Sequence, residues 1–228
     1  MTGGEGFRIF DVSNPSAPAE IGSFDAYGNV LDWATDGRYA YLAEGYAFEI
    51  VDISDPAHPV FVSRLFNFDL NARGISLVGR IACLSDPDRY YSGPLSFVDV
   101  SSALYPAAFA LPKVEGRFHA TASRGNYLYA IDYREGELKV FDLSDPKQLR
   151  LAGSCPAPAG VTGMALSETR LYASGNGKVH VFDVRYPGSP RWESSYVTAG
   201  TAEKVFVSGN LIFVADGPAG VSIFRGRR

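Results

Sequence analysis

The hexapeptide Phe10-Asp11-Val12-Ser13-Asn14-Pro15 returns along the chain with small changes. Later copies read Val-Asp-Ile-Ser-Asp-Pro at residues 51–56, Val-Asp-Val-Ser-Ser at 98–102, Phe-Asp-Leu-Ser-Asp-Pro at 141–146 and Phe-Asp-Val-Arg-Tyr-Pro at 182–187. Their aspartates follow one another at steps of 41, 47, 43 and 41 residues. A weaker sixth copy spans residues 221–225, where Arg225 takes the place of the aspartate. This period predicts a chain built from repeated units of about 40–45 residues.

Each unit contains four short runs of apolar, aromatic and β-branched residues, bounded by Gly, Asp and Pro. In one unit these runs are Arg73–Val78, Arg80–Ser85, Leu95–Ser101 and Ala107–Pro112, which we call a, b, c and d. Such runs are typical of strands, and no window has a helical period. Four antiparallel strands in a unit of this length predict one blade of a β-propeller.

The repeated aspartates fall in the turn between strands c and d. Asp and Ser side chains accept hydrogen bonds from the amides of such a turn, and Pro presets its φ angle. We therefore interpret the aspartates at positions 11, 52, 99, 142 and 183 as structural. One aspartate per blade does not converge on one ion, so we predict no metal site and no cofactor.

The segments FRIFDVSNPSAP, FEIVDISDPAHP and LKVFDLSDP, together with YLAEG and FVADG, resemble the LVIVD repeat family. The resemblance covers nearly the whole chain, with departures at residues 101–103, at Arg185 and at Arg225. It implies a β-propeller, usually in bacterial or archaeal extracytoplasmic or cell-surface proteins, and it brings no catalytic motif. The chain has no signal-peptide pattern at its start, so a cytoplasmic location is the alternative.

We predict one all-β domain over residues 1–228, a β-propeller of four-stranded antiparallel blades. Its units are residues 1–24 (half a blade), 29–66, 72–112, 118–154, 161–196 and 201–228 (a partial blade). We expect five blades, with strands from both ends sharing one blade, because such closure removes exposed edges. Six blades or an incomplete ring are the alternatives. Strand c is supplied twice, so the surplus edge strand could also join copies of the chain into a homo-oligomer.

Composition excludes several classes of protein. Lys and Arg number 21 against 25 Asp and Glu, a formal net charge of −4, which argues against a nucleic-acid-binding surface. No run approaches the roughly 20 apolar residues of a membrane helix, so we predict no membrane insertion. The cysteines at positions 83 and 155 suit small buried side chains and do not decide the compartment.

Candidate binding residues come from aligning the blades on strand b. This alignment gathers polar side chains near the start of strand a, at the mouth of the predicted channel: Asp32, Arg73, His119, Glu203 and Lys204. The b–c loops share that face, and they add the aromatic and basic residues Arg89, Tyr90, Tyr91, Tyr133 and Arg134. Tyr and Arg commonly anchor interfaces or stack on sugars and peptides. His58 falls in a c–d turn and His180 at a generic polar position of strand c, so neither is a candidate.

Two functions fit this pattern. The first is a binding or scaffold module that recognises a protein or a small polar ligand, for example a carbohydrate, at the channel mouth and the b–c loops. The alternative is a hydrolase or lyase acting on a sugar or another small polar substrate, with His119 as base and Glu203 or Asp88 as its carboxylate partner. Sequence alone leaves the choice between enzyme and binding module open.

Overall fold

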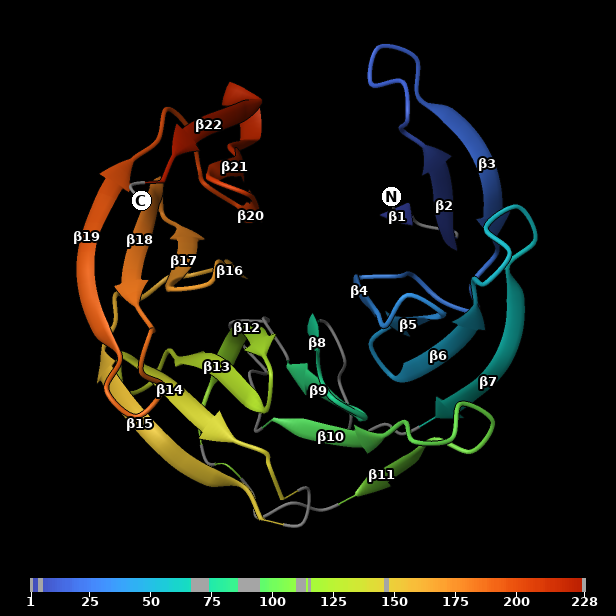
Figure 1. The fold of residues 1–228 in the computed structure, drawn as a ribbon, viewed down its shortest axis with the longest axis horizontal. Coiled ribbons are helices and arrows are strands. Elements are labelled where there is room, and N and C mark those ends of the chain that lie inside the picture. Colours follow the sequence, from blue (N-terminus) through green and yellow to red (C-terminus); the bar gives the residue numbers. More distant parts are fainter. Residues whose placement is uncertain are drawn as a thin grey trace. The chain divides into compact units, whose positions relative to one another are not determined.

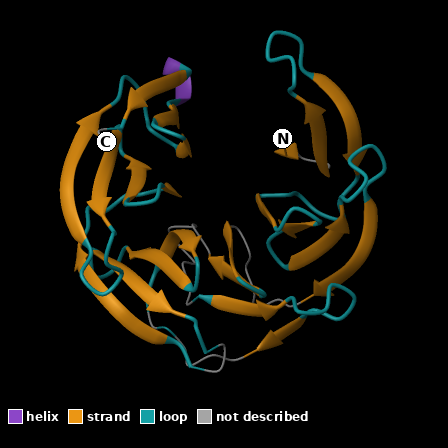
Figure 2. Cartoon of the chain, in the orientation of Figure 1, coloured by secondary structure: helices purple, strands orange, loops and turns teal. Residues whose placement is uncertain are grey.

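The described chain is almost entirely β-structure. A computed structural model describes residues 2–3, 6–66, 74–85, 95–109, 114, 116–145 and 148–226. Within these ranges helix is limited to one 3-10 turn, η1 (Gly217–Ala219), and strands and turns make up the rest (Figure 2). This confirms the all-β prediction.

Two compact units make up the chain, residues 1–86 with 95–110, and residues 87–94 with 111–228. The first unit contains three antiparallel sheets. Their strands are β1 (Thr2–Gly3), β2 (Gly6–Asp11) and β3 (Ala19–Phe24); β4 (Asp32–Thr35), β5 (Tyr39–Ala43), β6 (Ala47–Asp52) and β7 (Val60–Phe66); and β8 (Gly74–Val78), β9 (Ile81–Ser85), β10 (Ser96–Asp99) and β11 (Ala107–Phe109).

The second unit also contains three antiparallel sheets. Their strands are β12 (Phe118–Arg124), β13 (Tyr127–Asp132), β14 (Glu137–Asp142) and β15 (Arg150–Pro156); β16 (Gly163–Leu166), β17 (Arg170–Gly175), β18 (Lys178–Asp183) and β19 (Arg191–Val197); and β20 (Lys204–Ser208), β21 (Leu211–Ala215) and β22 (Val221–Arg225). In each four-stranded sheet the strands lie side by side in chain order, as the predicted blade requires (Figure 1).

The c–d turns have the predicted geometry. The carboxylate of Asp11 accepts a hydrogen bond from the backbone N–H of Ser13 at 2.8 Å, and Asp142 accepts one from Ser144 at 2.8 Å. The same bond is present at Asp52, Asp99 and Asp183. These aspartates are therefore structural residues of the turn.

Successive sheets of a unit pack face to face. In the second unit Tyr129, Leu138 and Val140 of one sheet pack in a cluster with Leu171 and Phe182 of the next. This explains why strands b and c are apolar on both faces: each sheet is covered from two sides when it has two neighbours.

The terminal strands differ from expectation. β1, β2 and β3 form a three-stranded sheet of their own, and β20, β21 and β22 form another, so the expected blade shared by the two ends is not among the described ladders. One reason is β1, which the sequence did not reveal: it pairs with β2, with Thr2 opposite Phe7. The described strands thus form six sheets, the number of the six-bladed alternative.

Candidate functional site

The b–c turn of the sheet β12–β15 is held in place by one buried carboxylate. Asp132 Oδ1 accepts hydrogen bonds from the backbone N–H groups of Arg117 at 3.1 Å and Arg134 at 3.0 Å. Its Oδ2 accepts a bond from the Lys139 ammonium at 2.9 Å, and that ammonium also pairs with Glu135 at 2.7 Å. Burial alone would raise the pKa of Asp132, but the bonds from Lys139 and the backbone lower it. The turn is therefore anchored by an ionised carboxylate.

This anchored turn presents two of the predicted binding residues. Tyr133 is 41% exposed and Arg134 is also exposed. The Tyr133 ring lies beside the buried imidazole of His119, with 5.2 Å between the ring centroids and a tilt of 43°. The fold thus brings His119 and Tyr133 together, with Arg134 next in the chain. The alignment had placed them on one face without showing this contact.

Glu203 and Lys204, at the start of β20, are both exposed. The Glu203 carboxylate accepts a hydrogen bond from the Thr201 hydroxyl at 3.1 Å. The backbone carbonyl of Glu203 accepts one from the Thr162 hydroxyl at 2.7 Å. The bond from Thr162 ties the start of β20 to the start of β16, so this position connects neighbouring sheets.

Asp32 has a similar structural contact in the first unit. Its carboxylate accepts a hydrogen bond from the backbone N–H of Ile75 at 3.2 Å, which joins β4 to β8. The other predicted site residues, Arg73, Asp88, Arg89, Tyr90 and Tyr91, lie outside the described residues.

His58 and His180, which we did not expect to be site residues, lie in different surroundings. His58 is exposed in its c–d turn and its Nδ1 is 2.9 Å from the Asp55 carboxylate, as expected of a turn residue. His180 is buried on β18, and within the described part of the chain its Nδ1 has no hydrogen-bond partner. Burial lowers its pKa, which keeps the ring neutral. The sequence had treated His180 only as a polar position.

A pair of carboxyl groups in the first unit was missed by sequence reasoning. Glu44 directly follows β5, and the fully buried Glu49 lies on β6. Burial, together with the neighbouring Glu49 carboxylate, raises the pKa of Glu44 to about 8, so Glu44 keeps its proton at neutral pH. Glu49 is paired with the Arg64 guanidinium at 2.5 Å, and that guanidinium lies 4.4 Å above the Tyr27 ring. The signal was present in the alignment, because Glu44 and Glu49 take the positions of Asp132 and Lys139.

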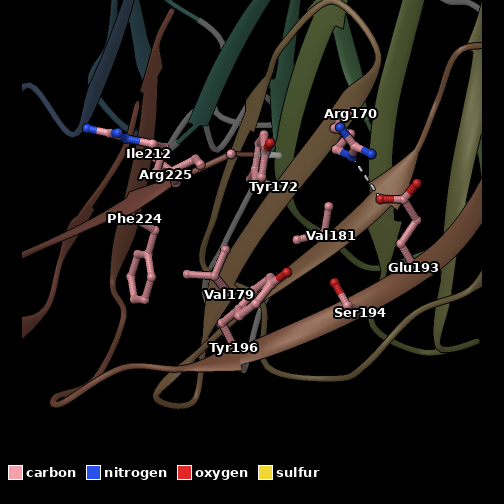
Figure 3. Close-up of a pocket in the computed structure, with 11 residues that line it drawn as sticks. Arg170, Tyr172, Val179, Val181, Glu193, Ser194, Tyr196, Ile212, Phe224 and Arg225 are labelled. Carbon is pink, nitrogen blue, oxygen red and sulfur yellow. Dashed lines mark hydrogen bonds and ion pairs between the residues drawn. The ribbon is translucent and has the colours of Figure 1, made fainter. Parts of the chain in front are cut away.

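A hollow of about 600 Å³ lies between the sheets β16–β19 and β20–β22 (Figure 3). Its apolar lining comes from both sheets, and an ion pair between Arg170 and Glu193, 2.8 Å apart, lies on one side. Arg225 and Gly226, at the end of β22, complete the lining. The sequence did not predict this hollow, although a last sheet with only three strands was a signal for it.

The described part of the chain holds neither a candidate metal site nor a candidate membrane-spanning helix. Within the described ranges, no three His, Cys, Asp or Glu side chains are grouped so that they could hold a metal ion. The same ranges contain no helix with the length and apolar character needed to span a membrane.

Comparison with protein families gives one match. The model of the LVIVD repeat matches residues 2–26, 27–66, 121–156 and 199–223, which together are more than half of the chain. No curated protein matches the chain.

Solved structures show the same fold at low sequence identity. A functionally unknown protein from Desulfotomaculum acetoxidans matches with a TM-score of 0.77 at 12% identity, over 95% of this chain and 74% of that one. A putative 6-phosphogluconolactonase from Bacteroides uniformis matches with a TM-score of 0.72 at 16% identity, over 92% and 71%. The β-propeller domain of Cps50 (Swd1) from Myceliophteria thermophila matches with a TM-score of 0.62 at 14% identity, over 92% and 77%. This chain is a β-propeller.

Proposed function

Because the chain belongs to the LVIVD repeat family, which brings a scaffold and no catalytic motif, we propose that it is a non-catalytic binding module. It recognises a protein or a small polar ligand, such as a carbohydrate, through the face that holds the b–c turns. The family resemblance favours a place outside the cytoplasm or at the cell surface.

The observation that carries this proposal is the anchored turn at residues 132–136. Asp132 binds two backbone amides of its surroundings and the Lys139 ammonium, so the backbone is fixed before a ligand arrives. A fixed turn loses little conformational entropy on binding. It presents Tyr133 and Arg134, and these two residue types dominate binding energy at interfaces.

The test begins with a ligand screen. Labelled protein is applied to a glycan array and to a peptide array, and the dissociation constant of any hit is then measured. We expect Tyr133→Ala and Arg134→Ala each to weaken binding at least about tenfold, or about 1.4 kcal/mol. Their melting temperatures should stay within about 2 °C of the wild type, because both side chains are exposed.

Tyr186→Ala is the matched control, since Tyr186 is an exposed tyrosine in a c–d turn, away from the b–c turns. It should bind as the wild type does. A screen without any ligand, or a ligand whose affinity neither Tyr133→Ala nor Arg134→Ala changes, contradicts the proposal.

A hydrolase or lyase is the second candidate. One observation favours it: the buried imidazole of His119, at the start of β12, lies against the ring of the exposed Tyr133. The neighbour described as a putative 6-phosphogluconolactonase is too distant in sequence to support more than the fold. A catalytic His119 would also need a nearby acid, and the Glu203 carboxylate is bonded to Thr201. Turnover of a sugar lactone that His119→Ala abolishes would favour this candidate over the binding module.

A further inference from the structure

In three of the outer strands d, a small residue in the middle of the strand is covered by the c–d turn of the next sheet. At Gly22 of β3 an added Cβ atom would lie 2.0 Å from the carbonyl oxygen of Pro56. At Gly153 of β15 it would lie 2.7 Å from the carbonyl of Gly188. Ser63 of β7 donates a hydrogen bond to the carbonyl oxygen of Ala103 at 2.5 Å. The repeat therefore builds the same close contact at three interfaces between successive sheets.

Ser194 of β19 is the equivalent residue at the interface with the sheet β20–β22. It pairs with Val181 of its own strand c, as Gly153 pairs with Val140. No turn among the described residues covers Ser194; it lines the hollow shown in Figure 3. The hollow is thus the place that a c–d turn and a strand d occupy elsewhere in this chain.

The neighbouring edge of β22 is able to accept such a strand. Among the described residues β22 pairs only with β21, so its outer backbone groups have no strand beside them. An uncovered edge of this kind is a template for an added strand, which binds through backbone hydrogen bonds and through pockets for alternate side chains. The end of β22 keeps the geometry of the repeat, because Gly226 N–H bonds to the carbonyl of Asn210 as Val184 N–H bonds to that of Thr169.

The charge at the end of β22 identifies the strand that fits. In the two preceding sheets the last residue of strand c is an aspartate opposite an arginine of strand d: Asp142 faces Arg150, and Asp183 faces Arg191. Arg225 replaces that aspartate, so the matching residue on an added strand is acidic. The described outer strands have Ala19, Val60, Ala107, Arg150 and Arg191 at this position. None of them is acidic, so none of these outer strands in a second copy offers the matching charge.

We propose that the edge of β22, with the hollow beside it, binds an extended segment of another protein as a fourth antiparallel strand. An Asp or Glu of that segment faces Arg225. The apolar lining formed by Tyr172, Val179, Val181, Tyr196 and Phe224 receives its apolar side chains. This surface is separate from the turn that presents Tyr133 and Arg134, so either proposal can fail without the other.

The probe is a fluorescent nine-residue peptide with the sequence of residues 189–197 carrying Arg191→Glu. The control peptide keeps the arginine. We measure fluorescence anisotropy at low ionic strength with the whole chain. The wild type should bind the Glu peptide at least tenfold more tightly than the Arg peptide, and Arg225→Asp should reverse this preference. Arg225→Ala should abolish the preference.

Hydrogen exchange supplies an independent readout, since the bound Glu peptide should protect amides of residues 221–225. Circular dichroism melting checks that the Arg225 variants fold, as expected for an exposed side chain. Absence of binding by both peptides overturns the proposal, as does a preference that Arg225→Asp leaves unchanged. A dimer in sedimentation equilibrium whose β22 amides are already protected would also overturn it, because a second copy would then occupy the edge.

Discussion

The sheets β12–β15 and β20–β22 share one repeat but differ in what covers them. Leu138 and Val140 on strand c of the first sheet are fully buried, packed against the sheet that follows. Val221 and Ile223 at the equivalent positions of the last sheet are 64% and 59% exposed. The same pattern of residues is therefore core in one place and surface in the other, and the neighbouring sheet makes the difference.

The b–c turns of these two sheets also differ, in the hydrogen-bond donors to their buried carboxylate. The buried carboxylate of Asp132 is paired with a cation, Lys139. The buried carboxylate of Asp216 instead accepts bonds from the hydroxyls of Thr198 and Ser222, both at 2.7 Å. Burial would raise the pKa of Asp216, but these and backbone hydrogen bonds lower it to about 2. Both sheets therefore have a buried carboxylate at this position of the repeat, but its side-chain hydrogen-bond donors are an ammonium in one sheet and hydroxyls in the other.

The largest loss of stability should come from removing the carboxylate of Asp132, because its hydrogen-bond donor Lys139 is a buried cation. Asp132→Ala leaves the buried Lys139 with Glu135 alone, and we expect it to lower the free energy of unfolding by about 4 kcal/mol. Asp216→Ala should cost about 2 kcal/mol, because hydroxyl groups left without a partner are less costly than a buried charge. Urea denaturation measures both. If Asp216→Ala lowered the free energy of unfolding as much as Asp132→Ala or more, this interpretation of the two b–c turns would be contradicted.

One pair of variants compares the covered strand c of the sheet β12–β15 with the exposed strand c of the sheet β20–β22. Leu138→Ala removes a fully buried side chain and should cost about 3 kcal/mol. Val221→Ala changes an exposed one at the equivalent position and should cost less than about 0.5 kcal/mol. Chemical denaturation of both variants checks the difference. Similar losses for the two would show that the outer face of β20–β22 is covered in solution.

The b–c turn of the sheet β4–β7 gives a third case, because the carboxyl group of Glu44 there lies next to that of Glu49. Its pKa rises from an ordinary 4.5 to about 8 on folding, so its contribution to stability is full below pH 4.5 and is lost as the pH rises to about 8. After allowance for solvent screening of a half-buried group, we expect a loss of about 1 kcal/mol across this range. Glu44→Gln should lack this slope when unfolding is followed from pH 4.5 to 9. Parallel curves for the wild type and Glu44→Gln would contradict the raised pKa of Glu44.

Much of the fold could be predicted from the repeat, because turn chemistry is local. The predicted strand Arg80–Ser85 matches β9 (Ile81–Ser85), and the turn after each of the five aspartates has the expected bond. The pairing of the two ends could not be predicted, since strand c has the same pattern wherever it occurs. β1 was missed because two residues carry no periodic signal.

The site was predicted less well, for a physical reason. Alignment places residues on a face, and the two residues His119 and Tyr133 that it placed on one face have rings in contact. It does not show which polar side chains are already used by the fold, as Asp32 is by Ile75. It also missed the burial of Glu49, because a buried acid depends on an arginine from a different strand.

Every described ladder joins strands that follow one another in the chain. The order of assembly follows from this, because strand pairing between near neighbours closes only short loops and is fast for a β protein. A sheet also gains from each neighbour it packs against, as in other repeat proteins, so folding can start in any interior sheet and spread along the chain. The sheet β20–β22 leaves Val221 and Ile223 exposed, so it gains less from its neighbours than the interior sheets do, and we expect it to join late and open early.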